Sequence, residues 1–222
     1  IFMLIGFLSG ISAGAGGSVA RFFGAGDEKN LQRAVHTTVA FGLVAGVLMT
    51  GVGVALSPQI LRWMDTPESV MRESVTYLQI YFAGSLGFVM YNVLVGILQA
   101  VGDSRHPLYY LIVSSVINLV LDLLFITGFH TGVGGAAVAT VISQIVSALL
   151  CFWQLLRTKE SYGLKIRKIR FDKGILVQII KIGLPSGVQN SIIAFANVIE
   201  GNRDLVFRKG RGFGQRAFSR AG

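Results

Sequence analysis

Charged residues are scarce in this sequence. Asp, Glu, Lys and Arg together make up 14% of its 222 residues, whereas hydrophobic residues make up 52%. Soluble domains carry about 25% charged residues. This composition excludes a soluble enzyme of ordinary make-up, and the high hydrophobic content also excludes a disordered chain. The sequence therefore predicts a membrane protein.

Cysteine is nearly absent, since Cys151 is the single one. One cysteine excludes an internal disulfide and a cysteine-based metal site. The three histidines, His36, His106 and His130, fall at the ends of apolar runs. We expect them to be solvated surface residues rather than metal ligands.

Long uncharged runs are abundant, and about 20 mainly apolar residues suffice for one membrane-spanning helix. Six such spans are predicted, at 1–19, 34–56, 75–100, 108–129, 133–156 and 175–199. The fold class expected is an all-α polytopic membrane protein. Because the sequence opens inside a span and has no basic leader segment, we expect a fragment rather than a signal peptide.

The basic residues predict the orientation, because cytoplasmic loops are enriched in Lys and Arg. With the loop 157–173 inside, alternation of the spans leaves only Arg62 and Arg72 in the outside loops. The inside loops then hold Arg21, Lys29, Arg33, Arg105, Arg157, Lys159, Lys165, Arg167, Lys168, Arg170 and Lys173. The sequence therefore predicts that it starts outside, with at least one helix missing before it.

The loop 157–173 is longer and more basic than the others, which predicts a cytoplasmic linker between two bundles; the alternative, which is compatible with it, is a simple positive-inside loop that touches anionic lipid. The expected organisation is a partial N-terminal bundle at 1–156, this linker, and the first helix of a C-terminal bundle at 174–200. Residues 201–222 turn abruptly polar, glycine-rich and basic. We expect this tail to be frameshifted or non-native sequence rather than an RNA-binding segment.

Glycines recur at helical spacing within the spans. Gly6, Gly10 and Gly14 follow one another every four residues, as do Gly42 and Gly46. In a membrane, small residues at this spacing let helix backbones approach closely. The glycine-rich run fits neither a phosphate-binding loop nor a dinucleotide-binding pattern, so helix packing is the favoured interpretation.

Asp122 is the one acid well inside a clear span. An acid there costs roughly 2.5–3.5 kcal/mol on insertion scales and usually marks an ion pathway. Asn118 lies one helical turn earlier. Thr140 and Gln144 of the next span fall at matching depths, because a helix rises about 1.5 Å per residue. Four polar side chains could therefore converge between two antiparallel helices.

Two cations suit such a cluster. Oxygen ligands bind small alkali or alkaline-earth ions, whereas a carboxylate removed from water favours its protonated form. We predict that Asp122, Asn118 and Thr140 couple to a cation or proton, and that they bind Na⁺ if the ion is sodium. The alternative is that the amides and the hydroxyl only hold the helices together around a protonated Asp122.

Four stretches together resemble the multidrug and toxic compound extrusion (MATE) family of cation-coupled exporters. They are GSVARFFGAGD at 17–27, LQAVGDSRHP at 98–107, GGAAVAT at 134–140 and GLPSGVQNS at 183–191. The resemblance covers about residues 1–199. It implies helices two to seven of a twelve-helix transporter built from two six-helix bundles, of which the first is partial here.

The resemblance also bears on the site. Asn118, Asp122 and Thr140 match the places of a sodium or proton site on the fifth and sixth helices of one family branch. Gln144, Gln189 and Asn190 are expected to line the cavity. Two features depart from the family: its first helix, with another functional Asp, is absent, and the second bundle ends almost where it begins.

The function expected from these observations is a Na⁺- or H⁺-coupled antiporter that exports drugs or organic cations across the cytoplasmic membrane, present here as a fragment. A flippase for lipid-linked oligosaccharides is the alternative, although the second to fifth spans hold no Lys or Arg to bind phosphate. An enzyme is not expected, because Asp122 has no acid or histidine partner at its depth.

The partners expected are membrane lipid and a small organic cation or drug, and no nucleic acid. No cofactor is expected besides Na⁺ or H⁺ as the coupling ion. We expect the full-length protein to be a monomer.

Overall fold

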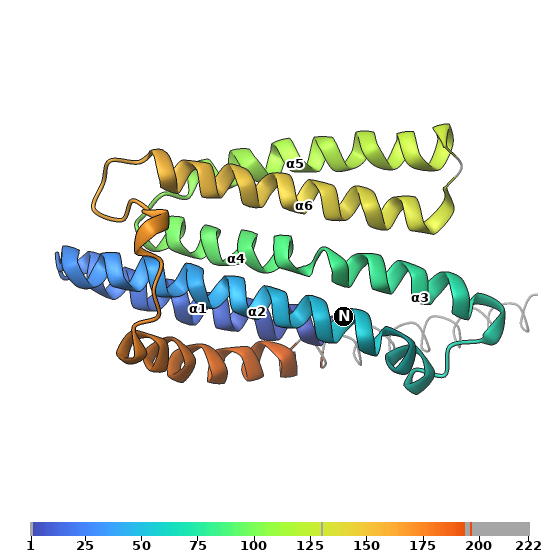
Figure 1. The fold of residues 1–222 in the computed structure, drawn as a ribbon, viewed down its shortest axis with the longest axis horizontal. Coiled ribbons are helices and arrows are strands. Elements are labelled where there is room, and N and C mark those ends of the chain that lie inside the picture. The colour runs from blue at the N-terminus through green and yellow to red at the C-terminus, as the bar shows by residue number, and fades with distance from the viewer. Residues whose placement is uncertain (1, 130, 194–195, 197–222) are drawn as a thin grey trace, which may run out of the picture.

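The computed structural model describes residues 2–129, 131–193 and 196 (Figure 1). Within these ranges every regular element is a helix. The six labelled helices are α1 (Phe2–Gly24), α2 (Glu28–Trp63), α3 (Glu68–Ala83), α4 (Ser85–Ala100), α5 (Arg105–Leu123) and α6 (Gly132–Arg157). His130 and the tail 201–222 lie outside the described residues, so the expectations for them stay predictions.

Two short turns and one more helix complete the description. A π-helical turn, η1 (Leu124–Gly128), extends α5, and a 3₁₀ turn, η2 (Ile166–Lys168), lies beyond α6. A further long helix covers residues 173–193. The expected linker 157–173 therefore occupies the largely irregular segment between α6 and this last helix.

Several helices are long enough to cross a bilayer. In the described part of the chain, α2, α5 with η1, and α6 are each long and apolar enough, and the pair α3–α4 makes a fourth span if counted as one. α2 is longer than the predicted span 34–56. Its 36 residues measure about 54 Å at 1.5 Å per residue, so its ends project beyond an apolar layer about 30 Å thick.

The predicted span 75–100 ends where expected but begins earlier and is bent. The helical segment begins at Glu68 and breaks at Gly84, where α3 and α4 meet at a bend of 42°. A Cβ atom on Gly84 would lie 2.3 Å from the Cγ2 atom of Val141 on α6. Only glycine therefore lets α6 pack against the bend.

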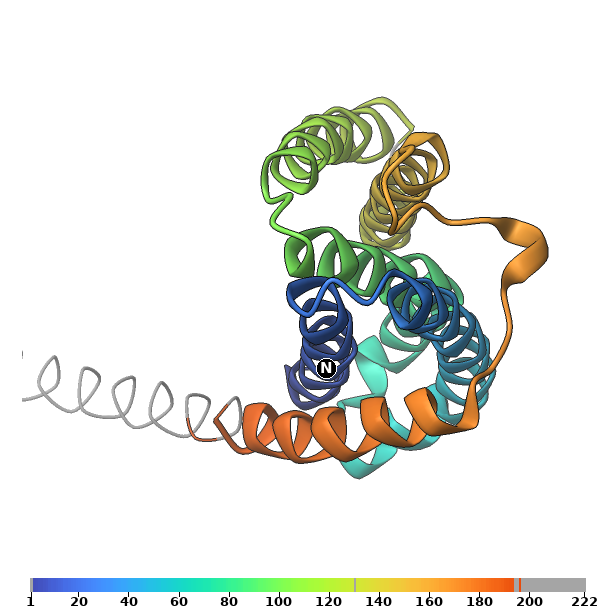
Figure 2. The ribbon, with the colours of Figure 1, turned by 90° about the vertical axis from the view of Figure 1, so that its left-hand side faces the viewer.

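α4 is the centre of the bundle. It packs against α1, α2 and α6, and its side chains Leu94, Ile97 and Leu98 are fully buried. Figure 2, seen from the end of the bundle, shows α5 and α6 on one side of α4 and α1 and α2 on the other. The helix 173–193 crosses beyond α1, strongly inclined to the bundle (Figure 2).

The glycine spacing of α1 forms the contact with this crossing helix. A Cβ atom on Gly10 would lie 2.2 Å from the Cα atom of Gly187, and one on Gly14 would lie 2.4 Å from the Cα atom of Gly183. Glycines four residues apart thus meet on both helices, as in small-residue packing in membranes. The prediction of close helix packing is confirmed here.

The second glycine pair has the same role between α2 and α4. A Cβ atom on Gly46 would lie 2.6 Å from the Cδ1 atom of Leu86, and one on Gly42 would lie 3.1 Å from the Cγ2 atom of Val93. The two helices therefore approach more closely than larger residues would allow.

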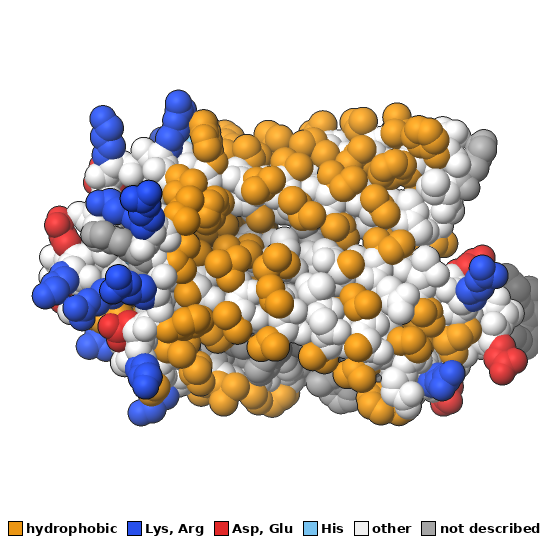
Figure 3. All heavy atoms as spheres, in the orientation of Figure 1, with side chains coloured by type: hydrophobic (Ala, Val, Ile, Leu, Met, Phe, Trp, Pro, Cys, Tyr) orange, Lys and Arg blue, Asp and Glu red, His pale blue; other side chains and the backbone are white. Residues whose placement is uncertain are grey.

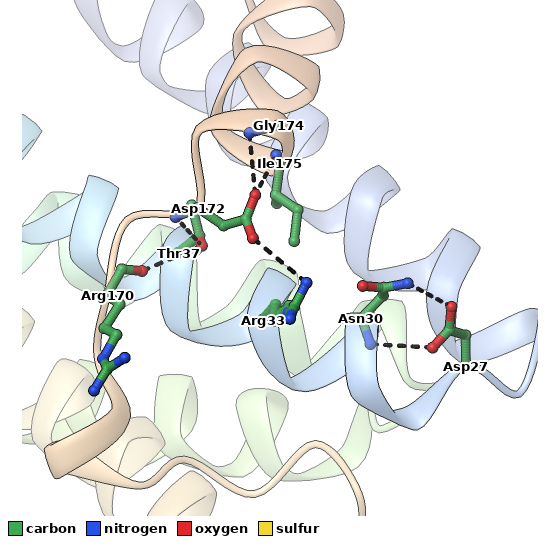
Figure 4. Close-up of polar contacts among 8 residues, drawn as sticks. All are labelled: Asp27, Asn30, Arg33, Thr37, Arg170, Asp172, Gly174 and Ile175. Carbon is green, nitrogen blue, oxygen red and sulfur yellow. Dashed lines mark hydrogen bonds and ion pairs between the residues drawn. The ribbon is translucent and has the colours of Figure 1, made fainter.

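α2 begins at an acidic cap. The Asp27 carboxylate accepts hydrogen bonds from the Asn30 backbone N–H at 3.1 Å and from its Nδ2 atom at 2.6 Å (Figure 4). These bonds, the backbone one first, hold the pKa of Asp27 below its ordinary value. The cap satisfies an N–H group that the first turn of a helix leaves unpaired.

Two buried polar side chains of α2 hold the segment that follows α6. The Nε2 atom of His36 accepts a hydrogen bond from the Lys165 backbone N–H at 3.1 Å. The Thr37 hydroxyl donates to the Arg170 carbonyl and accepts from the Asp172 N–H, both at 3.2 Å (Figure 4). His36 is only 3% exposed, so the expectation of a solvated histidine at this position is wrong.

The Thr37 contact can be tested by an isosteric change. Thr37→Val removes the hydroxyl and leaves a carbonyl and an N–H of the segment without partners, which costs about 1–3 kcal/mol. We expect trypsin to cleave the segment at Lys165 and Arg167 at least about five times faster. Each 1.4 kcal/mol lost raises the population of the open segment tenfold. Thr76→Val is the control, since the Thr76 hydroxyl is exposed and bonds only within its own helix. Equal cleavage rates in both variants would contradict the contact.

The charged side chains lie at the two ends of the bundle, and most of the basic ones lie at one end. Figure 3 shows Lys and Arg side chains gathered at one end and a broad hydrophobic band beside them. The basic loops that the sequence places inside meet at this end, at the α1–α2 turn, the α4–α5 turn and the segment after α6. The arrangement agrees with the predicted orientation, which a labelling experiment tests directly.

Two matched cysteine substitutions report the orientation. In a Cys151→Ser background, we expect a membrane-impermeant maleimide to label Glu68→Cys in intact cells. Glu160→Cys should react only after permeabilisation, because positive-inside loops stay in the cytoplasm. Both glutamates are exposed and both lie outside the long apolar segments. The reverse pattern would contradict the orientation.

Candidate ion-coupling site

The predicted polar cluster lies on the outermost helix pair. α5 packs along α6, and its opposite face presents exposed apolar side chains, among them Val116, Leu119 and Val120. Asn118 and Asp122 are half-buried. They lie one helical turn apart, so their side chains share one face of α5.

One polar atom on each of these two residues is enclosed without a partner. The Oδ1 atom of Asp122 and the Nδ2 atom of Asn118 are shielded from solvent and form no hydrogen bond within the described residues. More than about 90% of buried polar groups in proteins have a partner, and leaving one unpaired costs about 1–3 kcal/mol. A bound cation, a proton or a water molecule would satisfy the Asp122 oxygen, whereas the Asn118 N–H group needs an acceptor such as a water or carboxylate oxygen.

The backbone changes its winding directly after Asp122. η1 (Leu124–Gly128) is a π-helical turn, a form that is rare and often found at functional sites. The Thr127 hydroxyl donates to the Leu123 carbonyl, and the Thr131 hydroxyl donates to the Phe125 carbonyl at 2.7 Å. The Phe125 carbonyl also accepts from the Thr131 backbone N–H at 3.1 Å, so the threonine hydroxyls add bonds within this turn.

The predicted partners on α6 are half-buried. The Thr140 hydroxyl donates to the Ala136 carbonyl of its own helix at 3.0 Å. Its oxygen keeps lone pairs that can accept a further bond or bind a cation. The Gln144 side chain lies within hydrogen-bonding reach of Tyr81, on the bent pair α3–α4. Gln144 therefore connects the helix pair α5–α6 with the rest of the bundle.

Gln189 and Asn190 lie elsewhere. They belong to the helix 173–193, on the far side of the bundle from α5 and α6 (Figure 2). Gln189 lines a shallow, mainly apolar hollow of about 490 Å³ with neighbours on its own helix. The structure does not bring these two residues to the Asp122 cluster, and a role in lining a larger cavity stays a prediction.

Asp122 has no charged neighbour in the sequence around it. Between residues 106 and 156, Asp122 is the only Asp, Glu, Lys or Arg. No basic side chain of α5 or α6 therefore neutralises it near its own depth. A counter-charge for an ionised Asp122 would therefore have to come from another helix or from a bound cation.

Sequence reasoning missed the roles of His36, Thr37 and Tyr81. Each is a polar residue inside or beside a long uncharged run. A polar residue in such an apolar context was the feature that could have identified them. Their partners lie 63 to 135 residues away along the chain. The pairing therefore could not be inferred from local spacing.

A model of the family described as MatE matches residues 1–124, more than half of the chain. The chain belongs to the MATE family. Its polytopic helical fold is therefore that of a multi-pass membrane protein of this family, as the resemblance predicted. The fold is a partial first bundle of the MATE type.

Curated relatives agree with the family. The chain is 32% identical over 204 residues to the "Probable multidrug resistance protein YoeA" of Bacillus subtilis, covering 89% of this chain and 44% of the relative. It is 25% identical over 199 residues to the multidrug export protein MepA of Staphylococcus saprophyticus, covering 90% of this chain and 44% of the relative. The chain thus spans less than half the length of these MATE proteins.

A solved structure shares the fold. It is described as the inward-facing conformation of a multidrug resistance MATE family transporter of the MOP superfamily. The two align with a TM-score of 0.80 and 27% identity, over 88% of this chain and 44% of the other. The helix arrangement described above is therefore a MATE arrangement.

Proposed function

We propose that the full-length protein containing this chain is a cation-coupled antiporter that exports drugs or organic cations. Na⁺ or H⁺ would enter the cell in exchange. The observation that carries the proposal is the enclosed, unpartnered Oδ1 atom of Asp122 beside the equally unpartnered Nδ2 atom of Asn118. The names of the relatives, which are multidrug resistance and export proteins, support the class of substrate.

The residues have distinct roles in this proposal. The Asp122 carboxylate is the group that gains and loses the coupling ion. The Asn118 carbonyl oxygen and the Thr140 hydroxyl oxygen complete the set of oxygen ligands that a small hard cation prefers. If the ion is a proton, Asp122 carries it and the Asn118 amide donates to the remaining carboxylate oxygen.

Coupling requires that the ion bind the two conformations of the transporter unequally, because a ligand with equal affinity for both shifts nothing. The α5–α6 pair is placed for such a change. It lies at one side of the bundle, and the π-helical turn η1 follows Asp122 directly. Rearrangement of this turn would alter the depth and the partners of the carboxylate.

The proposal is tested with the full-length protein in inverted membrane vesicles. A fluorescent organic cation is added, and a Na⁺ gradient or a proton gradient is imposed in the direction that loads the vesicles. We expect uptake driven by one of the two gradients and abolished when that gradient is collapsed. Uptake that is indifferent to both gradients would contradict cation coupling.

A further inference from the structure

A cavity of about 500 Å³ lies at the basic end of the bundle, away from the Asp122 cluster. One wall is the first three turns of α2, and the other is the segment that leads into the helix 173–193. Its volume falls in the range of about 300–1,000 Å³ that is typical of small-molecule sites. The proposed transport function assigns nothing to it.

The walls of this cavity are fixed in place. His36 and Thr37 contribute to its lining and are themselves buried, at 3% and 0% exposure. Both bind the main chain of the opposite wall, through Lys165, Arg170 and Asp172. The cavity is therefore built by buried side chains and does not depend on mobile surface groups.

The lining carries more positive than negative charge. Lys29, Arg33 and Arg170 line the cavity with a single acid, Asp172. The Oδ1 atom of Asp172 already accepts from the N–H groups of Gly174 and Ile175, at 3.0 and 3.3 Å (Figure 4). Its Oδ2 atom lies 3.8 Å from the Nη1 atom of Arg33.

The other two cations form no close ion pair. Neither Lys29 nor Arg170 pairs with an acid in any part of the chain that the structure describes, and Lys29 contributes only the smallest of the effects that lower the pKa of Asp27. In Figure 4 the Arg170 side chain extends away from the Arg33–Asp172 pair. Both side chains are exposed and can pair with an anion.

The cavity lies on the polar side of the exposed apolar surface of the bundle. Further along α2, exposed apolar side chains begin at Leu43, ten residues beyond Arg33 and about 15 Å away along the helix at 1.5 Å per residue. Along the last helix they begin at Val177, five residues after Asp172. The ring of Phe171, in the lining, is 50% exposed. A charged headgroup with an apolar body attached could enter here.

We propose that this cavity binds the phosphate-bearing headgroup of an anionic phospholipid. Lys29 and Arg170 would pair with the phosphate, and Phe171 would contact the start of the acyl chains. Basic pockets of this kind, on the cytoplasmic side of membrane helices, bind anionic lipid headgroups, and Arg matches phosphate geometry well. The lipid would bridge α2 and the linker and so hold the last helix on the first bundle.

Thermal unfolding of the full-length protein in neutral detergent tests this proposal. The probes are phosphatidylglycerol, phosphatidylcholine and soluble glycerol 3-phosphate, each titrated against the protein. We expect phosphatidylglycerol to raise the midpoint and the two other compounds to leave it nearly unchanged. The increase should shrink with added salt, because the pairing is electrostatic.

Two double variants with the same loss of charge separate the cavity from the loop as a whole. Lys29→Gln with Arg170→Gln should weaken phosphatidylglycerol binding roughly 30-fold, from about two favourable basic contacts. Lys159→Gln with Arg167→Gln, which changes exposed residues of the same loop outside the lining, should leave binding near the parent value. If the first double variant does not fold, Arg170→Gln alone takes its place, with a roughly fivefold loss expected.

Several results would overturn the proposal. Equal stabilisation by phosphatidylcholine would remove the requirement for an anion. Equal stabilisation by glycerol 3-phosphate would show that the cavity takes a soluble phosphate rather than a lipid. Equal losses in the two double variants would show that the lipid responds to the overall charge of the loop.

Discussion

Replacing Asp122 by Asn in the full-length protein is expected to reduce gradient-driven export to background. Asn is nearly the same size as Asp but can neither bind a proton nor contribute a negative charge to a cation site. The ion would then lose its unequal affinity for the two conformations, and a difference of about 1.4 kcal/mol already changes their populations tenfold. We therefore expect export to fall about tenfold or more, measured as fluorescent cation uptake into inverted vesicles.

A matched control separates this effect from a general loss of protein. Asp65→Asn is the same substitution at an exposed residue with φ of 51°, a backbone conformation that Asn adopts readily. Export should stay near the parent value in this variant, with equal amounts of protein in the membrane. Undiminished, gradient-dependent export by Asp122→Asn would remove Asp122 from the coupling mechanism.

The second large effect is expected on stability, from adding one methyl group to α1. Gly14→Ala places a Cβ atom 2.4 Å from the backbone of Gly183 and 3.0 Å from the carbonyl oxygen of Ile179. Neither contact can be relieved by a side-chain rotation, so the helix 173–193 must move away. Overpacking of this kind costs about 1–3 kcal/mol, which thermal unfolding of the chain in detergent would measure.

Gly17→Ala is the control on the same helix. A Cβ atom on Gly17 meets no other atom within 4 Å. Alanine is the better helix former by roughly 0.5–1 kcal/mol, so this variant should unfold at the same temperature as the parent or higher. The two alanine substitutions, three residues apart, should thus act in opposite directions. Equal effects would show that helix propensity, and not the glycine contact, governs this region.

Much of the helical layout follows from the sequence alone. An uncharged run of about 20 residues leaves few options in a membrane, because backbone groups in lipid must be paired within a helix. The glycine spacing at Gly10 and Gly14 also predicted a close contact, although the partner glycines Gly183 and Gly187 become evident only in the folded chain. Asp122 and Asn118 stood out because charge is so scarce around them.

The features that sequence reasoning missed depend on contacts between distant segments. At the break, Val141 of α6 occupies the space that a side chain on residue 84 would need. The periodicity of one helix does not reveal which side chain of another helix packs against it. His36 ends up buried because the segment around Lys165 folds over it. The π-helical turn that follows Asp122 contains local hydroxyl–carbonyl bonds that composition does not reveal.

The depth matching of α5 and α6 predicted the pairing of the two helices but not the bond that the Thr140 hydroxyl forms. It placed Thr140 near Asp122 from helix rise alone, and the two helices do pack side by side. The hydroxyl, however, bonds the Ala136 carbonyl of its own helix. A ligand role for Thr140 therefore remains a prediction, in which a bound cation would contact the lone pairs of this hydroxyl oxygen.

The most direct test of the central claim is a measurement of ion binding by the purified full-length protein. Radioactive Na⁺ bound at equilibrium, or protons released and taken up on a pH step, are counted per protein molecule for the parent and for Asp122→Asn. The account predicts that one bound Na⁺ or one proton is lost in the variant, while Asp65→Asn matches the parent. The same stoichiometry in the parent and in Asp122→Asn would contradict it.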